Sequence, residues 1–213
     1  EYADHERFID RGIPTADGEP VERFEKIVFG DEDQNLQTLT ANIMRANVSH
    51  MLSDTSKLNI SVLSSDYEKM YQNLYAAAYD AETNVVTMDG YYDPTERENF
   101  MMSANLVSEL DFGGMKHTLL VGTEVIDTQN KNTRYDSYWI TSGSDKESFI
   151  VTRPLDFSVT NLGVATAFDF ATKLKSRTES DIAVSSFYVQ DQIEVSDKVL
   201  LILGGRMDTF DIT

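Results

Sequence analysis

Aromatic rings and arginine side chains cluster at two places in this sequence, and they are its best candidates for ligand chemistry. A run of six residues, 134–139, holds one guanidinium and three rings, and a second group precedes it in the chain. The candidates are Arg134, Tyr135, Tyr138, Trp139, Tyr91, Tyr92 and Arg97. Guanidinium groups donate charge-assisted hydrogen bonds and aromatic faces stack, so the set suits a bulky, anionic, partly aromatic ligand. The alternative is that these arginines only balance the acids around them.

Other kinds of site chemistry find no support in the sequence. The three histidines lie far apart, without metal-ligand spacing. The run Asp31-Glu-Asp-Gln-Asn35 begins like a calcium loop, but Leu36 stands where the turn glycine belongs and Asn42 where the bidentate glutamate belongs. Phosphate-binding loops, dinucleotide fingerprints and nucleophile elbows do not occur. We therefore predict no metal site, no resident cofactor and no catalytic residue, so the protein is not expected to be an enzyme.

The composition narrows the range of partners. With 18 Lys and Arg against 36 Asp and Glu, the formal net charge is -18, which argues against nucleic acid as a partner. The absence of cysteine excludes disulfides and thiolate metal sites. No apolar run reaches the roughly 18 residues of a spanning helix, whereas a spanning strand needs only about 10 alternating residues.

The candidate residues are expected in long, exposed loops, and strands must position these loops, because apolar and polar side chains alternate along much of the chain. The clearest strand lies at 99–112, with polar residues at the intervening positions. Its apolar face consists of Phe100, Met102, Ala104, Leu106, Leu110 and Phe112. A similar alternation at 185–195 and 201–208 predicts a hairpin, broken on its apolar face only by Asp191. Tyr67, Tyr71 and Tyr75 share one strand parity, which favours an aromatic belt at a membrane interface over a helix face.

The connections predict an asymmetric sheet. Short turns near Thr55, Gly114 and Asp197 fall on one edge, and long loops near residues 1–35, 74–96 and 129–182 fall on the other. Within the loops, short strands are expected at 26–29, 149–151 and 164–170. Short turns on one edge with long loops on the other are the habit of outer-membrane barrels.

Four segments carry a family resemblance. Tyr188-Val-Gln-Asp-Gln-Ile-Glu194 followed by Leu203-Gly-Gly-Arg-Met-Asp208 resembles the mid-barrel hairpin of TonB-dependent outer-membrane receptors, in particular the siderophore-receptor branch. Three further places look like the same family and follow in family order. They are Asp10-Arg-Gly-Ile-Pro14 with Phe29-Gly-Asp31, Asp66-Tyr-Glu-Lys-Met-Tyr-Gln-Asn73, and Gly114-Met-Lys-His-Thr-Leu-Leu-Val-Gly-Thr-Glu124.

The resemblance implies an all-β fold, an antiparallel meander of about six to eight strands within a transmembrane barrel of about 22 strands. Residues 1–213 would then be a partial barrel, without the plug domain and the carboxy-terminal strands. The complete protein would lie in the outer membrane of a Gram-negative cell, in contact with its lipid. It would bind a ferric siderophore and contact TonB through the missing amino-terminal part.

Two alternatives remain open at this point: a soluble extracellular β-sandwich that binds a ligand, and a secreted β-rich hydrolase with a carboxylate pair. The environment of the apolar strand face distinguishes the barrel from the sandwich, because a sandwich buries that face against a second sheet. In a barrel the polar set faces a concave lumen and the apolar set faces lipid. The expected inward set is Glu124, Gln190, Gln192, Glu194, Arg206 and Asp208. The expected outward set is Leu119, Val121, Ile193, Leu201 and Leu203.

Overall fold

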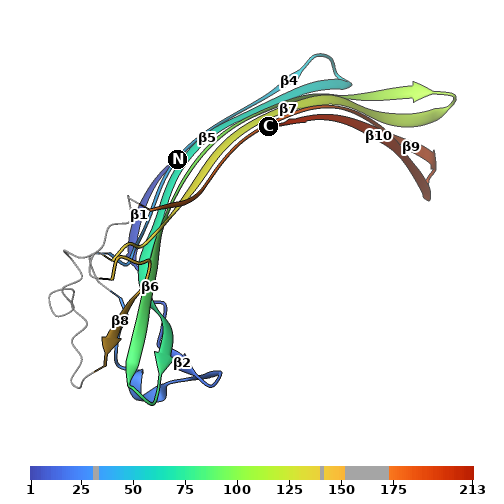
Figure 1. Cartoon of the computed structure of the whole chain (residues 1–213). Coiled ribbons are helices and arrows are strands. Elements are labelled where there is room, and N and C mark those ends of the chain that lie inside the picture. The colour runs from blue at the N-terminus through green and yellow to red at the C-terminus, as the bar shows by residue number, and fades with distance from the viewer. Residues whose placement is uncertain (31–33, 140–141, 152–172) are drawn as a thin grey trace.

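One curved antiparallel sheet makes up most of the structure, a computed structural model that describes residues 1–30, 34–139, 142–151 and 173–213 (Figure 1). This eight-stranded sheet has the order β1-β4-β5-β6-β7-β9-β10, with β8 paired to β6. Its strands are β1 (Tyr2–Phe8), β4 (Leu36–Met51), β5 (Ser56–Asp80), β6 (Val85–Phe112), β7 (Met115–Asp136), β8 (Glu147–Ile150), β9 (Leu174–Ser196) and β10 (Val199–Ile212). A small hairpin of β2 (Thr15–Ala16) and β3 (Glu19–Pro20) precedes the 3-10 turn η1 (Glu22–Phe24). The predicted all-β meander is confirmed.

The three predicted short turns lie together at one edge of the sheet. Residues 52–55 join β4 to β5, residues 113–114 join β6 to β7, and residues 197–198 join β9 to β10. Figure 1 shows these turns at the upper right of the arc. Gly113 and Gly114 both adopt positive φ, +62° and +78°, a backbone conformation that two-residue hairpin turns require and glycine tolerates.

The predicted long loop at 74–96 is wrong. β5 and β6 run for 25 and 28 residues and are joined by the short connection 81–84. The turn-forming residues that suggested a loop are accommodated within the strands. Pro94 pairs with Met70 of β5, but it has no partner in the register with β7, so its missing N–H breaks no hydrogen bond there.

The two other predicted loops are also partly strand. Residues 2–8 form β1 against the start of β4, while the strand expected at 26–29 is not formed. Of the loop predicted near 129–182, residues up to 136 continue β7 and residues from 174 belong to β9. The short strand expected at 149–151 corresponds to β8, and the one expected at 164–170 lies outside the described residues.

The two faces of the sheet differ in chemistry. Successive side chains of a strand point to opposite sides, and the pairing registers carry this alternation across the sheet. We call inner face the side with the row Asn47, Ser61, Ser103, Glu124, Ser186 and Asp208. We call outer face the side with the row Val48, Ile60, Ala104, Thr123, Phe187 and Met207. By this register the residues predicted to point inward share the inner face and those predicted to point outward share the outer face, so the predicted separation of the two sets is confirmed.

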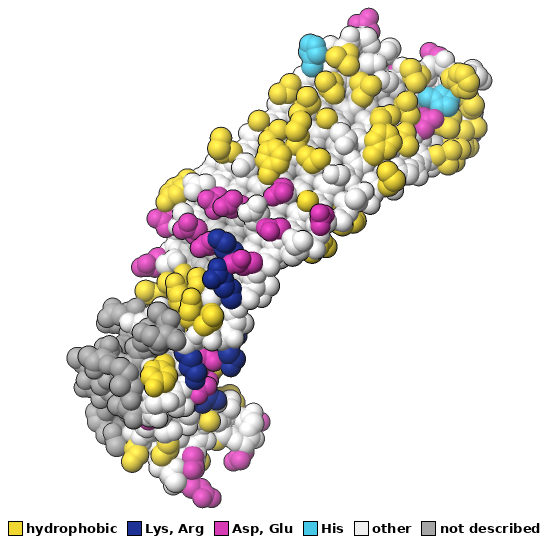
Figure 2. All heavy atoms as spheres, turned by 45° about the horizontal axis from the view of Figure 1, so that its top comes forward, with side chains coloured by type: hydrophobic (Ala, Val, Ile, Leu, Met, Phe, Trp, Pro, Cys, Tyr) yellow, Lys and Arg dark blue, Asp and Glu magenta, His cyan; other side chains and the backbone are white. Residues whose placement is uncertain are grey.

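Hydrophobic side chains cover the convex side of the arc towards the short turns, and acidic side chains form the next band (Figure 2). On the outer face the acidic band begins at Asp127 and continues where the register aligns Asp66, Glu98 and Asp181. Large apolar side chains of the outer face are exposed, for example Met44 at 75% and Met207 at 68%. Among the described residues no second sheet covers this face, which contradicts the sandwich alternative and suits contact with lipid. No helix in the described part of the chain is long and apolar enough to cross a membrane.

A small hydrophobic core lies at the end of the sheet opposite the short turns. There Leu74 of β5 and Met88 of β6 pack with residues from the segments before β4 and after β7. The core consists of Phe24, Phe29, Leu74, Val86, Met88, Trp139 and Val151. It anchors the connecting segments to the strand ends, and it therefore fixes the surface that the next section describes.

Candidate ligand-binding site

Three tyrosine rings gather on the inner face near this end of the sheet. Tyr71 and Tyr75 lie two positions either side of Asn73 in β5, and Tyr91 of β6 pairs directly with Asn73. The rings of Tyr71 and Tyr91 are stacked, with centroids 5.9 Å apart, and Tyr75 meets Tyr91 edge-on at 6.1 Å. Because strands hold all three rings, they form a pre-organised aromatic surface beyond the apolar band.

Arg11 joins these rings from a distant part of the sequence. It precedes Gly12, whose backbone N–H donates to the Asp10 carboxylate at 2.8 Å and whose φ is +82°. Arg11 Nη1 donates to the Tyr91 hydroxyl at 2.6 Å. Its guanidinium carbon lies 4.8 Å from the Tyr75 ring centroid and 5.7 Å from that of Tyr91. Arg11 makes no ion pair with a carboxylate of the described residues, so most of its donors are available to a ligand.

Arg134 lies on the other side of Tyr91 and is held differently. Its Nε and Nη2 donate to the two Asp93 carboxylate oxygens at 2.8 and 2.5 Å, a bidentate pair between β7 and β6. This hydrogen bonding raises the pKa of Arg134. The guanidinium carbon is 4.2 Å from the Tyr91 ring centroid. Arg134 therefore supports the ring, with its charge already matched.

Tyr75 contributes a hydroxyl that stays protonated. Burial raises its pKa above 10.0, and the negative charge of Asp89, which also accepts a hydrogen bond from the hydroxyl, raises it further. Lys146 Nζ lies 3.6 Å from the Asp89 carboxylate, so the negative charge of Asp89 is balanced within the protein. We call Arg11, Tyr71, Tyr75, Tyr91 and Arg134 the inner cluster. It offers aromatic faces, tyrosine hydroxyl groups and one guanidinium, that of Arg11, which has no carboxylate partner among the described residues.

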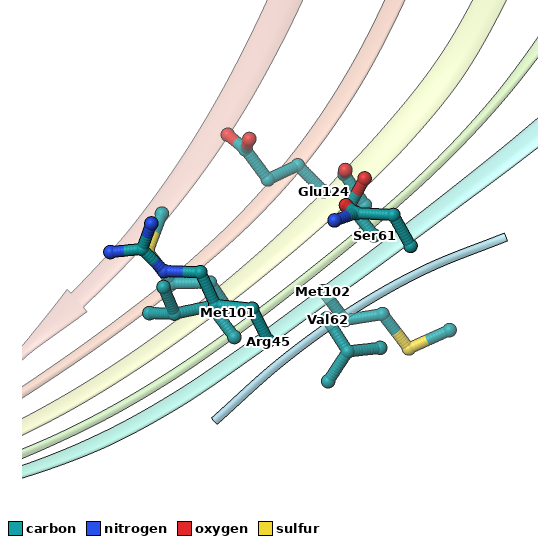
Figure 3. A pocket seen from close by; sticks show the side chains of 9 residues that line it. Arg45, Ser61, Val62, Met101, Met102 and Glu124 are labelled. Carbon is teal, nitrogen blue, oxygen red and sulfur yellow. The ribbon is translucent and has the colours of Figure 1, made fainter. Parts of the chain in front are cut away.

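A hollow of about 380 Å³ lies nearer the middle of the sheet (Figure 3). Arg45, Ser61 and Glu124 line it from the inner face, while Val62 and Met102 point to the other side of the strands. Glu124 is engaged by Arg206 Nη2 at 2.8 Å. Among the described residues no group of histidine or acidic side chains is arranged to hold a metal ion. The hollow carries none of the residues that the sequence predicted for ligand binding.

Comparison with known proteins identifies the family. Residues 4–213 match the family model described as "TonB dependent receptor-like, beta-barrel". The chain belongs to the TonB-dependent receptor family. Members of this family are transport receptors of the outer membrane and not enzymes. The predicted fold class, family and membrane are thereby confirmed, and the hydrolase alternative is wrong.

Individual relatives agree with this placement. The chain is 25% identical over 213 residues to a protein of Acinetobacter baumannii named "Probable TonB-dependent siderophore receptor PiuA", covering 96% of this chain and 28% of that protein. The ferripyoverdine receptor of the Pseudomonas aeruginosa outer membrane superposes with a TM-score of 0.77 at 14% identity, covering 100% of this chain and 27% of the receptor. The ferric-catecholate import receptor Fiu of E. coli K12 gives 0.69 at 15% identity, covering 99% and 33%. The chain thus spans about a quarter to a third of the length of these relatives.

Within this receptor barrel, the structure divides the seven residues that the sequence grouped. Tyr91 and Arg134 belong to the inner cluster, and Arg97 lies further along the inner face, where its Nε donates to Asn130 Oδ1 at 3.2 Å. Tyr92 and Tyr135 point to the outer face, stack on each other at 5.8 Å and pack against the small core. The prediction that Tyr91, Tyr92 and Arg97 lie in a loop is wrong, because all three lie in β6.

The last two predicted residues lie between β7 and β8. Trp139 is 1% exposed and belongs to the core, so its expected place on an exposed loop surface is wrong. Tyr138 beside it is half-buried. Sequence reasoning missed Arg11, Tyr71 and Tyr75 as members of the site. Two signals could have found them. The segment Asp10-Arg-Gly-Ile-Pro14 was interpreted only as a family resemblance, and the shared strand parity of the tyrosines was interpreted as an aromatic belt at a membrane interface.

Proposed function

We propose that the complete protein is an outer-membrane receptor that binds a ferric siderophore at the inner cluster and imports it with energy relayed by TonB. The observation that carries this proposal is the position of the cluster. It lies on the inner face, which the receptor family turns towards the barrel interior, and at the edge opposite the short turns. In a barrel of this kind that edge is the extracellular mouth.

The chemistry of the cluster suits such a chelate. A ferric siderophore is bulky, often anionic and partly aromatic, so it can stack on Tyr71 and Tyr91 and accept hydrogen bonds from Arg11. Four structural relatives are named with iron chelates: ferripyoverdine, a ferric catecholate, ferric preacinetobactin and ferric citrate. These four define the panel of ligands to try. We assign the contact with TonB to parts of the complete receptor beyond this sheet.

Growth on a single iron source tests the proposal. A strain that lacks its own ferric-chelate receptors is supplied with the gene for the complete receptor and is given each of the four chelates in turn. We expect growth on at least one chelate only when the receptor is present, and loss of that growth when the tonB gene is deleted. Growth on none of the chelates, or growth that persists without TonB, would contradict the proposed function.

A further inference from the structure

Two asparagines lie side by side at the base of the inner cluster, and both are completely buried. Asn73 is in β5, and Asn35 immediately precedes β4, one position beyond the pair Leu36 and Gln72. Each side chain has 0% exposure. The two residues therefore have the same chemistry, the same burial and adjacent positions in the register, but they differ in their hydrogen bonds.

Asn35 has a full set of backbone partners. Its Nδ2 donates to the carbonyl oxygens of Ile9 at 3.1 Å and Leu74 at 2.9 Å, and its Oδ1 accepts from the Leu74 backbone N–H at 3.0 Å. These bonds tie the segment after β1 to β5. Asn35 is thus a structural asparagine, and its burial is explained by the backbone groups that it satisfies.

Asn73 has no such explanation. Neither its Nδ2 nor its Oδ1 has a hydrogen-bond partner in the described part of the chain. Leaving a buried amide unsatisfied costs about 1 to 3 kcal/mol for each polar group, so an apolar residue of similar size would be the more stable choice at this position. A polar group that a protein keeps buried at such a cost requires an explanation, and a ligand group that reaches it on binding provides one.

The neighbours of Asn73 are the groups that we assign to ligand binding. Tyr71 and Tyr75 flank it on the same side of β5, Tyr91 lies directly opposite on β6, and Arg11 reaches across the rings of Tyr75 and Tyr91. A ligand that stacks on Tyr91 and accepts hydrogen bonds from the remaining donors of Arg11 would lie against the strand pair that holds Asn73 and Tyr91. Movement of the Tyr71, Tyr75 or Tyr91 side chain on binding would open the buried side chain of Asn73, which these residues surround in the register, to the ligand.

We propose that Asn73 is a specificity-determining residue of the inner cluster and hydrogen-bonds an amide of the bound ferric chelate. Its carbonyl oxygen and NH₂ group stand side by side, so they match a group that also presents an acceptor and a donor together. Amides of a peptide-like chelator backbone have this arrangement, whereas the carboxylates of citrate only accept. This assignment rests on the proposed function and narrows its ligand class to amide-bearing chelates.

The test compares Asn73→Leu with the matched variant Asn35→Leu in the complete receptor. The probe is the best-bound member of a panel of ferripyoverdine, an amide-linked ferric catecholate, ferric preacinetobactin and ferric citrate, measured by equilibrium binding in detergent. We expect Asn73→Leu to weaken binding of that chelate about tenfold or more while the melting temperature holds or rises. Asn35→Leu should lower the melting temperature, because it removes three satisfied hydrogen bonds.

The outcomes separate the two proposals. If the wild-type receptor binds none of the four chelates, the proposed function fails. If it binds one and Asn73→Leu binds that chelate as tightly, the role of Asn73 is overturned while the proposed function stands. Preferential binding of ferric citrate, which has no amide, would overturn the assigned ligand class. Should leucine disturb folding, Asn73→Ser provides the same measurement, since a single hydroxyl cannot present an acceptor and a donor side by side as the carboxamide does.

Discussion

Replacing Val121 by arginine tests which face of the sheet meets lipid. Val121 lies on the outer face of β7, midway between the start of the strand at Met115 and the acidic position Asp127. It is flanked by Leu106 of β6 and Val189 of β9. This position therefore corresponds to the middle of the hydrocarbon layer, where a lipid-facing arginine costs about 2 to 4 kcal/mol.

The adjacent residue gives a control at the same depth. Leu120 belongs to the inner face and pairs with Val107 and Gln190. An arginine there would face a polar interior that can hydrate it, so Leu120→Arg should cost less than about 1 kcal/mol. The two variants carry the same new side chain one residue apart. The difference between their losses in free energy of unfolding therefore reports only which face of the strand carries the arginine.

The complete receptor is refolded into phospholipid vesicles and unfolded with urea. The folded fraction is measured from the different migration of folded and unfolded protein on an unheated SDS–polyacrylamide gel. The expected difference of about 1 kcal/mol or more corresponds to roughly a fivefold or larger change in the ratio of folded to unfolded protein. Equal losses for both variants, or a larger loss for Leu120→Arg, would refute the assignment of the outer face to lipid.

Three further predictions concern particular contacts. Trp139→Ala should destabilise the small core by about 3 to 5 kcal/mol because it leaves a cavity there, and limited proteolysis around β8 should accelerate; unchanged cleavage would contradict the core position. Gly122→Ala should cost about 1 to 3 kcal/mol, since its new Cβ would lie 2.3 Å from the Tyr188 ring, and Tyr188→Ala should remove most of this penalty in a double-mutant melting experiment. Because the folded-state pKa of Tyr75 is raised above 10.0, its stabilising contribution is complete below about pH 10 and is lost as the pH rises through the raised value. In an ultraviolet titration, Asp89→Asn should bring the Tyr75 transition back towards its ordinary pH, and an unaltered transition would exclude the Asp89 contact.

The turns and faces of the sheet could be predicted from the sequence because their signals are local. Gly113-Gly114 and residues 197–198 are short polar or glycine turns between alternating runs, and parity alone assigns Glu124 and Val121 to opposite faces. The length of β5 and β6 could not be predicted in this way. Asp89-Gly90 and Asp93-Pro94 are turn-forming pairs, so the sequence favours a loop there. The strand tolerates Pro94 because this residue has no pairing partner in β7, which only the structure shows.

The membership of the site was only partly predictable for the same reason. Tyr91 and Tyr92 are neighbours in sequence and would stay together in a loop, whereas a strand sends them to opposite faces. The error over the loop therefore became an error over the site. Arg11 reaches Tyr91 across 80 positions of sequence, a proximity that only the folded chain creates.

The contrast between Tyr91 and Tyr92 tests the central assignment most directly. Both are tyrosines of β6, but Tyr91 belongs to the inner cluster and Tyr92 packs against the core on the opposite face. Equilibrium binding of the cognate ferric chelate to the complete receptor in detergent is the measurement. Tyr91→Ala should weaken binding by about 1 to 3 kcal/mol, the usual cost of a lost stacking platform, while folded Tyr92→Ala should bind like the wild type. Wild-type affinity in Tyr91→Ala, or an equal loss in both variants, would contradict a ligand site on the inner face.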